Sequence, residues 1–385
     1  MSTKELPPIA LFANTSWYLY RFRKNLIRLL VSLGHETFAL APDKTHADDL
    51  QKIGAVSMTV DMDPYSISPL KAGSESRRIT KQLSSTFPTG LTLLPFTPKA
   101  NIYAGLARRK IHNLRTVHNI SGLGFSLSPD RSWVSHLAMR LLWRRALGAS
   151  DGILFQNDRD RGLFQKWCVG PAALTAVVPG SGVDLEQYTL SRSARSPSGI
   201  CRFVTAARLL RSKGVLLAAE AIKGLREKGL DCTLLICGIP QIDHPDGLTR
   251  LEIDRLDQDD GIRLILDCND IRRHLAAADA FVLPTTYAEG VPRSLLEAGA
   301  TGLPLIVSDN PGTSSTVINN ETGYILNDLG VDSLSDSLGS FARKSESEKA
   351  SMGRRSHAHI TTFYDERFVL DAYAQMIEVI SQFRR

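Results

Sequence analysis

Two glutamates, Glu289 and Glu297, stand with seven residues between them in a segment whose residue types suit the binding of a phosphorylated sugar. An apolar run at 280–284 predicts a strand, and Pro292 stands where the first turn of a helix tolerates a missing N–H. The backbone N–H groups of residues 293–295 are then expected to point out of the helix N-terminus, where they can bind a phosphate.

A carboxylate beside a bound phosphate is costly unless it accepts hydrogen bonds. Glu297, one turn inside the expected helix, is therefore expected to bind sugar hydroxyls rather than the phosphate. Taken as isolated residues, however, the two glutamates are better explained as a loop residue and a solvated helix residue. The pattern that surrounds them has to decide between these interpretations.

The elements that position these residues are indicated by short apolar runs that alternate with helical patterns. Apolar residues at helical spacing occupy 21–33, 216–228 and 291–301. This alternation occurs in both halves of the chain, and it predicts an α/β protein with two Rossmann-like domains, each a parallel sheet with helices on both faces. The expected strands are 9–13, 36–41, 55–60, 91–95, 115–117, 152–156 and 176–179, and then 202–207, 232–237, 262–266, 280–284, 305–308 and 323–326.

The boundary between the two domains is expected near 188–199, where Ser, Arg and Pro replace the apolar rhythm. The expected domains are 1–190 and 191–385. An amphipathic pattern at 367–383 predicts a C-terminal helix that is able to pack back on the first domain. Two such domains are expected to face each other across a cleft that the carboxyl ends of both sheets line.

Composition describes an ordinary globular protein with an uneven charge. The chain has 385 residues, 43% hydrophobic and 22% charged. Residues 1–190 hold 23 Lys and Arg against 14 Asp and Glu, whereas residues 191–385 hold 23 against 26. A basic first half indicates an anionic partner, which could be nucleic acid, a phosphorylated substrate or an acidic membrane surface, and a basic surface without a partner is the alternative.

The five cysteines form no Cys-x-x-Cys pair, and no histidine is spaced from them as in a zinc site. A disulfide framework is therefore not expected, and a reducing cytosol is favoured. The sequence contains no signal peptide pattern and no apolar stretch of the length that a spanning helix needs. The cysteines are Cys168, Cys201, Cys232, Cys237 and Cys268.

The segment EGVPRSLLEAGATGLPLIVSD at 289–309, followed by PG and then by a Gly-Tyr-hydrophobic strand, resembles the signature of the retaining GT-B glycosyltransferases of family four, the glycosyl transferases group 1. The resemblance implies a GT-B fold and a nucleotide-sugar donor held by the second domain. It also implies a catalytic role for Glu289. The nucleotide-sugar-binding residues that it implies are Gly290, Val291, Pro292, Arg293, Ser294, Leu295 and Glu297.

A second motif, FVTAARLLRSKG at 203–214, supports this resemblance. In that family the matching Arg and Lys bind the donor pyrophosphate, which implies the same role for Arg208 and Lys213. Departure of a nucleoside diphosphate concentrates negative charge, so two cations there stabilise the transition state more than the ground state. The alternative is a pair of surface cations at the start of a helix.

In the first half, FTPKANIYAGLARR and TVHNISGLGFSL resemble bacterial transferases that add galactose-type or N-acetylgalactosamine-type sugars to polyprenyl-linked oligosaccharides. The segments at 155–164 and 178–188 also fit, so the similarity covers nearly the whole chain. This resemblance implies that His118 lies near the sugar and the acceptor, and that Ser16 and Lys99 are acceptor-binding residues. A loop histidine with no ligand is the alternative for His118.

The resemblance implies no enzymatic nucleophile. In the favoured mechanism of retaining GT-B enzymes the acceptor attacks from the face that the diphosphate leaves, and the leaving phosphate accepts the acceptor proton. No metal and no cofactor is expected. Asp61-Met62-Asp63 looks like the Asp-x-Asp of metal-dependent transferases, but it follows a strand in the wrong kind of fold, and Arg208 and Lys213 already supply the positive charge.

The pattern at 133–147 predicts a basic amphipathic helix in which Trp143 suits a membrane interface. A polyprenyl diphosphate acceptor lies in the membrane, so we expect the basic first half to make peripheral contact with the inner face of the cytoplasmic membrane. A core-facing helix with solvated arginines is the alternative. The protein is otherwise expected to be cytoplasmic.

The motifs together predict a retaining glycosyltransferase that moves a hexose or N-acetylhexosamine, most readily from a UDP-sugar, to a lipid-linked or other glycan in bacterial cell-surface polysaccharide biosynthesis. Two alternatives remain at this point. One is a nucleotide-sugar 2-epimerase of the same fold, and the other is a non-catalytic nucleotide-sugar-binding protein. No motif favours nucleic acid as a partner.

Overall fold

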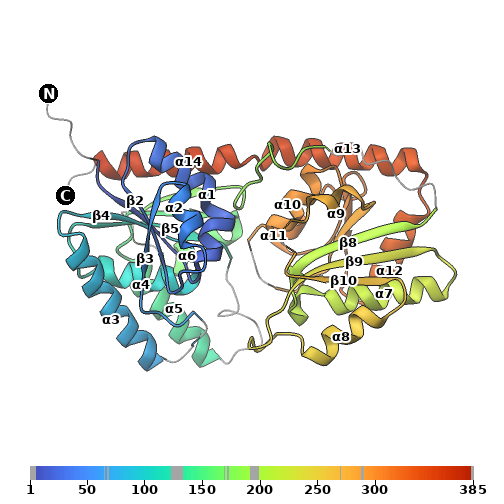
Figure 1. Cartoon of the computed structure of the whole chain (residues 1–385), viewed down its shortest axis with the longest axis horizontal. Coiled ribbons are helices and arrows are strands. Elements are labelled where there is room, and N and C mark those ends of the chain that lie inside the picture. The colour runs from blue at the N-terminus through green and yellow to red at the C-terminus, as the bar shows by residue number, and fades with distance from the viewer. Residues whose placement is uncertain are drawn as a thin grey trace. The chain divides into compact units, whose positions relative to one another are not determined.

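The computed structural model in Figure 1 describes residues 6–64, 66, 69–122, 133–168, 170, 173–190, 199–268, 270–287 and 290–382. The chain divides into two units. Unit 1 is Met1–Ser181 together with Arg367–Arg385, and unit 2 is Gly182–Glu366. The division therefore lies nine residues before the expected boundary between 190 and 191, and the C-terminal segment belongs to unit 1.

Unit 1 contains a seven-stranded sheet in which every neighbouring pair of strands is parallel. The order across the sheet is β3-β2-β1-β4-β5-β6-β7. The chain therefore builds the sheet outward from β1 in one direction and then returns to continue from β4 in the other. The strands are β1 Ile9–Phe12, β2 Thr37–Ala41, β3 Ala55–Thr59, β4 Leu91–Pro95, β5 Leu114–Ile120, β6 Gly152–Phe155 and β7 Leu174–Val177.

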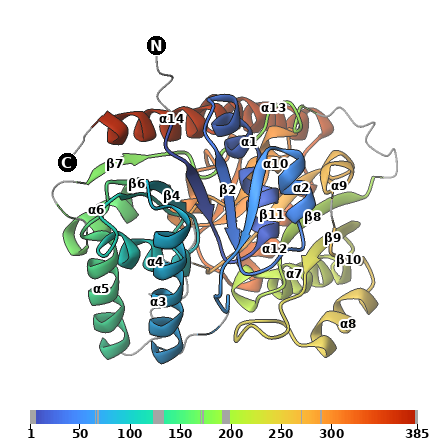
Figure 2. The same cartoon turned by 60° about the vertical axis from the view of Figure 1, so that its left-hand side comes forward.

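Side chains that alternate along each strand divide the core of unit 1 between the two faces of the sheet. Ala10 and Phe12 belong to the cluster under α3, α4 and α5, whereas Ile9 and Leu11 belong to the cluster under α1, α2 and α14. Figure 2 shows α3, α4 and α5 together at one face of this sheet. The helices are α1 Ser16–Ser32, α2 Ala47–Lys52, α3 Pro69–Thr86, α4 Pro98–Arg108, α5 Trp133–Leu147, α6 Asp158–Trp167 and α14 Glu366–Gln382.

Unit 2 repeats this arrangement with a parallel six-stranded sheet in the order β10-β9-β8-β11-β12-β13. Helices α7, α8 and α12 cover one core cluster, and α9 and α10 cover the other. The strands are β8 Cys201–Arg208, β9 Cys232–Ile239, β10 Ile262–Leu266, β11 Ala280–Leu283, β12 Leu305–Ser308 and β13 Gly323–Leu326. The helices are η2 Arg211–Lys213, α7 Val215–Glu227, α8 Arg250–Gln258, α9 Arg272–Ala276, α10 Arg293–Ala300, α11 Pro311–Ser314, α12 Val331–Ala342 and α13 Glu346–Phe363.

The two doubly wound parallel sheets confirm the prediction of an α/β protein with two Rossmann-like domains. Local signals set the ends of the first helix. Thr15 caps α1 by accepting a hydrogen bond from the amide of Tyr18, and the chain leaves this helix through Gly34 in the left-handed region, at φ 86°. Helix α1 begins five residues earlier than its apolar spacing indicated, because the cap lies at Thr15.

Candidate functional site

The sheet of unit 2 changes its winding direction between β8 and β11, which are paired neighbours. In open α/β sheets, ligands bind outside the carboxyl ends of the strands at such a switch point. Arg208 is the last residue of β8, and the segment 284–287 follows β11 directly. The residues predicted to bind the donor therefore lie where the topology favours a ligand.

Two cations meet one aromatic ring at this point. The guanidinium carbon of Arg208 lies 5.4 Å from the ring centroid of Tyr287, and the ammonium of Lys213 lies 5.1 Å from the same centroid. Attraction between each cation and the ring helps to hold the two like charges close together. Within the described residues, Arg208 has no carboxylate at ion-pair distance. Tyr287 was not predicted as a site residue, because an aromatic residue in a loop carries no such signal by itself.

Backbone contacts hold the loops after β8 and β11 together. The amide of Thr286 and the hydroxyl of Thr285 both donate to the carbonyl of Ser212, each at 2.8 Å. Gly214 has a φ of 70°, and a Cβ at this position would lie 2.1 Å from the carbonyl oxygen of Pro284. Only glycine allows this close approach, so Gly214 decides how near Lys213 comes to Tyr287.

The other charged groups nearby are already paired. Arg211 donates to Glu252, with Nη2 and Oε2 2.8 Å apart, and this bond is the main cause that lowers the pKa of Glu252 to about 2. The pKa of His244 is lowered, first by burial and then by the positive charge of Arg208. Arg211 is therefore largely neutralised by Glu252 and adds little to the positive charge of this region.

The start of α10 offers backbone amides, but not all of those that were expected. Pro292 is the N-cap residue, and its carbonyl accepts a hydrogen bond from the amide of Leu295 at 3.1 Å. The expectation that the Leu295 amide is free was therefore wrong. The amides of Gly290 and Ser294 have no hydrogen-bond acceptor among the described residues. The side chains of Val291 and Leu295 are buried in the core of unit 2.

Glu297 is 4% exposed and accepts a hydrogen bond from Arg293, with Nε and Oε1 3.0 Å apart. The two side chains lie one turn apart on α10, so Arg293 both orients and neutralises the carboxylate. Glu297 is thus neither solvated nor isolated, as it would be on an ordinary helix surface. Glu289, the other predicted carboxylate, lies outside the described residues.

In unit 1 the corresponding switch point lies between β1 and β4, and Ser16 and Lys99 follow these two strands. The Ser16 hydroxyl bonds to the carboxylate of Asp43 and accepts from the amide of His46 at 3.1 Å. The Lys99 ammonium lies 3.0 Å from a carboxylate oxygen of Glu75 and donates to the carbonyls of Asp63 and Ser66. Both predicted acceptor-binding side chains are thus bound within unit 1, so they would reach an acceptor only by exchanging these contacts.

His118 lies on β5 and is fully buried. Its Nδ1 is 2.9 Å from Oδ1 of Asn101, whose Nδ2 donates to two backbone carbonyls, so Nδ1 carries the proton. Nε2 has no partner among the described residues. Burial lowers the pKa of His118 to about 3, so the ring is neutral near pH 7 and offers Nε2 as a hydrogen-bond acceptor.

The Asp61-Met62-Asp63 motif is occupied by ion pairs. Asp61 lies 2.6 Å from Nε of Arg78, and Asp63 lies 2.5 Å from Nζ of Lys71. The Met62 side chain is buried in the core of unit 1. Each carboxylate therefore already has a cation, which is the arrangement of a structural surface rather than of a metal site.

Helix α5 has an apolar and basic surface, but Trp143 is not part of it. Trp143 is 3% exposed and packs edge-on against Phe164, so the expectation that it lies at a membrane interface was wrong. Trp133, Leu137 and Leu141 instead are 76%, 47% and 58% exposed, and Arg140, Arg144 and Arg145 are exposed beside them. In the part of the chain that the structure describes, no helix has the length and apolarity needed to cross a bilayer.

The chain is similar in sequence to known glycosyltransferases. Residues 190–357 match the family model described as glycosyl transferases group 1. A protein of Escherichia coli K12 named as a colanic acid biosynthesis glycosyltransferase, WcaL, is 23% identical over 325 residues, covering 80% of this chain and 76% of its own. The UDP-Gal:alpha-D-GlcNAc-diphosphoundecaprenol alpha-1,3-galactosyltransferase of Escherichia coli is 29% identical over 259 residues, covering 62% of this chain and 63% of its own.

Solved structures share the fold over almost the whole chain. The sucrose-phosphate synthase of Thermosynechococcus elongatus superposes with a TM-score of 0.76 and 17% identity, covering 97% of this chain and 99% of its own. The Anabaena protein HepE, crystallised with UDP and glucose, superposes with a TM-score of 0.73 and 16% identity, covering 98% and 100%. The two parallel-sheet units are therefore those of the GT-B fold.

Proposed function

We propose that this chain is a retaining glycosyltransferase that moves a hexose or N-acetylhexosamine from a UDP-sugar to a polyprenyl diphosphate-linked glycan. Two findings support this proposal: residues 190–357 match the model of the glycosyl transferases group 1, and the chain has the GT-B fold. The product would serve bacterial cell-surface polysaccharide biosynthesis, the role in which relatives such as WcaL are named.

The observation that carries this proposal is the pair of cations on Tyr287 at the switch point of unit 2. A nucleoside diphosphate carries two adjacent anionic groups, and Arg208 and Lys213 offer two adjacent cations. The amides of Gly290 and Ser294, at the start of α10, add uncharged donors beside them.

In the proposed reaction the bond between the anomeric carbon and the diphosphate oxygen breaks while an acceptor hydroxyl attacks the same carbon from the same face. The leaving diphosphate gains negative charge, which Arg208 and Lys213 stabilise, and its oxygen takes the proton of the acceptor hydroxyl. Glu297, oriented by Arg293, is proposed to accept hydrogen bonds from the ribose hydroxyls. Glu289 is proposed to bind the transferred sugar.

His118 is proposed to accept a hydrogen bond from a sugar hydroxyl through Nε2. A histidine whose pKa is about 3 is too weak a base to carry a proton near pH 7, so this role is recognition rather than acid–base catalysis. Because the ring is fully buried, a sugar would reach Nε2 only after its neighbours move.

The experiment that tests the donor offers UDP-glucose, UDP-galactose, UDP-N-acetylglucosamine and GDP-mannose, each with a polyprenyl diphosphate-linked acceptor. The galactosyltransferase relative is named for UDP-Gal, whereas mycobacterial relatives at 25% identity are named as GDP-mannose-dependent. We expect turnover with a UDP-sugar and a product that keeps the anomeric configuration of the donor. Turnover with GDP-mannose alone, or an inverted product, would contradict the corresponding part of the proposal.

The cation pair is tested in the same assay. Arg208→Ala or Lys213→Ala is expected to lower kcat by about 10²–10³-fold, as for the loss of one preorganised transition-state donor. Arg354→Ala is the matched control, because Arg354 is an exposed arginine of the same unit. Turnover of the Arg208 variant within a few-fold of the control would remove Arg208 from the mechanism. Release of a free epimerised nucleotide sugar would instead favour a 2-epimerase.

We further propose that unit 1 rests on an anionic membrane surface through α5, at the cytoplasmic face where lipid-linked acceptors would be reached. Trp133, Leu137 and Leu141 would enter the interface, and Arg140, Arg144 and Arg145 would meet lipid phosphates. The first half of the chain as a whole has more basic than acidic residues, and this positive charge would also be attracted to an anionic membrane.

Flotation with vesicles of anionic lipid at low salt tests the membrane contact. We expect the protein to float with anionic vesicles, to float less as salt is raised, and to stay behind with neutral vesicles. The combined variant Trp133→Gln/Leu137→Gln/Leu141→Gln is expected to lose flotation. Leu251→Gln, which changes a 59% exposed leucine of unit 2, should float as the wild type does. Equal flotation of both variants would exclude α5 as the contact.

A further inference from the structure

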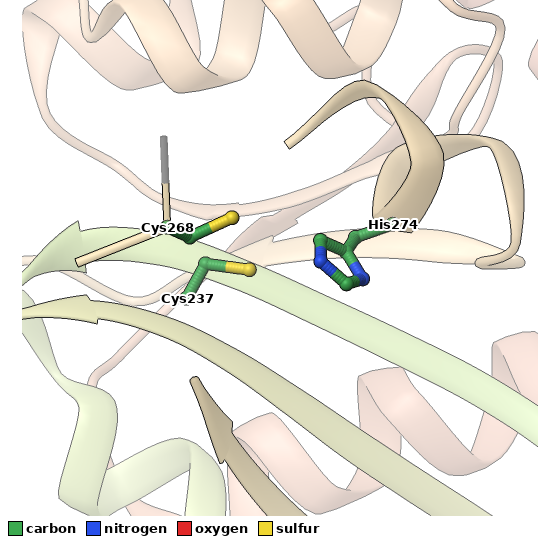
Figure 3. A group of neighbouring side chains, drawn as sticks. All are labelled: Cys237, Cys268 and His274. Atoms are coloured by element: carbon green, nitrogen blue, oxygen red, sulfur yellow. The ribbon is translucent and has the colours of Figure 1, made fainter. Parts of the chain in front are cut away.

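Three side chains with soft donor atoms come together in unit 2 although they are far apart in the sequence. Cys237, Cys268 and His274 offer two sulfur atoms and one ring nitrogen, and these atoms all lie within 4.8 Å of one another. Figure 3 shows the two thiols side by side with the imidazole beyond them. The sequence had indicated no such group, because no two of these residues have the short spacing of a zinc motif.

The cluster is built at the carboxyl edge of neighbouring strands. Cys237 lies near the end of β9 and pairs in register with Ile265 of β10. After β10, the amide of Asp267 donates to the carbonyl of Gly238 at 2.9 Å, and Asp267 itself adopts a left-handed conformation with φ 51°. This turn brings Cys268 beside Cys237, and the short helix α9 then supplies His274.

The donor set is that of a borderline-soft divalent ion. Zinc takes cysteine sulfur at about 2.3 Å and histidine nitrogen at about 2.0–2.1 Å in a tetrahedron. Ligand atoms around one ion are then about 3.4–3.8 Å apart, so donors within 4.8 Å need only small side-chain rotations. We propose that Cys237, Cys268 and His274 form a zinc-binding site, with the fourth position open to water.

The cluster is accessible from one side. Cys268 lines an open cavity of about 460 Å³, together with Ile265, Leu266, Asp267, Asp270 and Arg273. Cys237 is only 4% exposed and closes the inner side of the cluster. An ion would enter through the cavity, and a water molecule in the cavity would complete the tetrahedron.

Charge and protons balance in this binding step. Each thiol releases its proton to solvent as its sulfur binds the metal, so two thiolates neutralise the two positive charges of the ion. In the metal-free chain Nε of Arg273 donates to Nε2 of His274 at 3.1 Å. Arg273 is exposed, so it can turn away and release the imidazole lone pair to the metal.

The ion would tie α9 to the ends of β9 and β10, which are already paired with each other as far as Gly238 and Leu266. Because β9 is the neighbour of β8, this brace would lie one strand away from Arg208. The ion is proposed to stabilise unit 2, and this proposal does not depend on whether the chain transfers sugar. The expected consequence is a unit 2 that melts at higher temperature with zinc than without it.

Metal binding to the reduced, chelator-treated full chain tests the site, with Co²⁺ as the spectroscopic probe and Zn²⁺ as the competitor. We expect one Co²⁺ per chain, a near-ultraviolet charge-transfer band that reports thiolate ligation, and loss of that band when Zn²⁺ is added. Cys268→Ala and His274→Gln change partly exposed residues, and each should weaken binding by more than about 10²-fold, which exceeds the loss expected for a group that only hydrogen-bonds a metal ligand.

A matched control lies at the opposite end of the same strands. Cys201 and Cys232 are register partners on β8 and β9, but no histidine joins them among the residues that the structure describes. Cys201→Ala should bind Co²⁺ as tightly as the wild type. The proposal is overturned if metal uptake is substoichiometric, if the Cys268 variant binds like the Cys201 variant, or if the thiols join in a Cys237–Cys268 disulfide that an equivalent of zinc does not prevent.

Discussion

Tyr287 is the residue through which Arg208 and Lys213 act together. Two like charges repel each other, and a carboxylate between them would cancel the field that an anionic ligand needs. An aromatic face attracts both cations and carries no formal charge of its own. Tyr287 is therefore a positioning residue for the cation pair.

Replacing Tyr287 with leucine is expected to weaken ligand binding by removing two cation–π contacts. At about 0.5–1 kcal/mol for each contact, the loss corresponds to a 5- to 30-fold higher Kd for UDP, which titration calorimetry measures. Tyr287→Phe keeps the ring and should bind within about two-fold of the wild type. An equal loss in both variants would show that the phenol, not the ring face, matters.

His118 leads to a prediction about the pH dependence of stability. Burial lowers the pKa of this histidine to about 3 in the folded chain, whereas an unfolded histidine titrates near 6.5. Between these values the unfolded state binds a proton that the folded state does not, so this group makes the protein less stable as the pH falls below 6.5. Above pH 6.5 its contribution does not change with pH.

The comparison is between the wild type and His118→Asn, by urea unfolding at pH 7 and at pH 5. The wild type should lose about 2 kcal/mol more between the two pH values than the variant does, since 1.5 pH units of unmatched proton binding lie below 6.5. Any stability that the variant loses at both pH values cancels in this difference. Equal pH dependence would mean that His118 is protonated in the folded chain.

At the scale of elements, the site of unit 2 depends on loops that contact each other rather than on the strands alone. Ser212 accepts from the loop after β11, and Gly214 packs against Pro284 of that loop. Ser308, the last residue of β12, and Asn310, which follows it, both donate to the carbonyl of Thr285. Three carboxyl-edge loops are thereby joined, so a change in one is transmitted to the others.

Two glycines around α7 allow a matched test of this arrangement. Gly214→Ala places a Cβ 2.1 Å from a carbonyl oxygen and strains a left-handed residue, so it should destabilise unit 2 by more than about 2 kcal/mol and weaken UDP binding. Gly224→Ala has no atom within 4 Å of the new Cβ and lies inside α7, so it should stabilise by about 0.5–1 kcal/mol. Thermal unfolding of both variants checks the opposite signs.

At the scale of the whole molecule, the chain completes unit 1 with its last segment. Helix α14 follows unit 2 in sequence, yet Val369, Tyr373, Met376, Ile377 and Ile380 are buried in the core of unit 1. The hydroxyl of Tyr373 also accepts a hydrogen bond from Nδ2 of Asn119 at 2.8 Å. Unit 1 is therefore complete only when the full chain has been made.

Deleting Arg367–Arg385 is expected to unfold unit 1 and leave unit 2 folded. Five buried side chains at about 1.5–3 kcal/mol each amount to about 8–15 kcal/mol, which equals the whole stability of an ordinary domain. Limited proteolysis should then digest unit 1 and spare a fragment near Gly182–Glu366. Tyr373→Phe, which loses a single buried hydrogen bond at a cost of about 1–3 kcal/mol, should resist proteolysis as a control. A protease-resistant unit 1 in the deletion would contradict this account.

Much of the fold could be predicted because its signals are local. Apolar runs of strand length that alternate with helical spacing give two parallel sheets, and the positions of Arg208 and Lys213 after a strand place them at a carboxyl edge. The start of α10 was predicted to within two residues, but the hydrogen bond from the Leu295 amide to the Pro292 carbonyl was not predicted. Whether that amide is free or hydrogen-bonded depends on the φ and ψ angles of a single turn, and no periodic pattern in the sequence encodes those angles.

By itself, the sequence determined the elements, their alternation and the residue types at the strand ends, because periods of two and 3.6 residues can be recognised without knowledge of any partner. Only the tertiary structure decided which of those ends meet. It turned Trp143 inward and Trp133 outward on α5, placed Tyr287 against two cations, and brought Cys237, Cys268 and His274 together. These contacts result from the order of the strands and from the dihedral angles of a few loop residues. Neither can be recognised from a periodic pattern in the sequence.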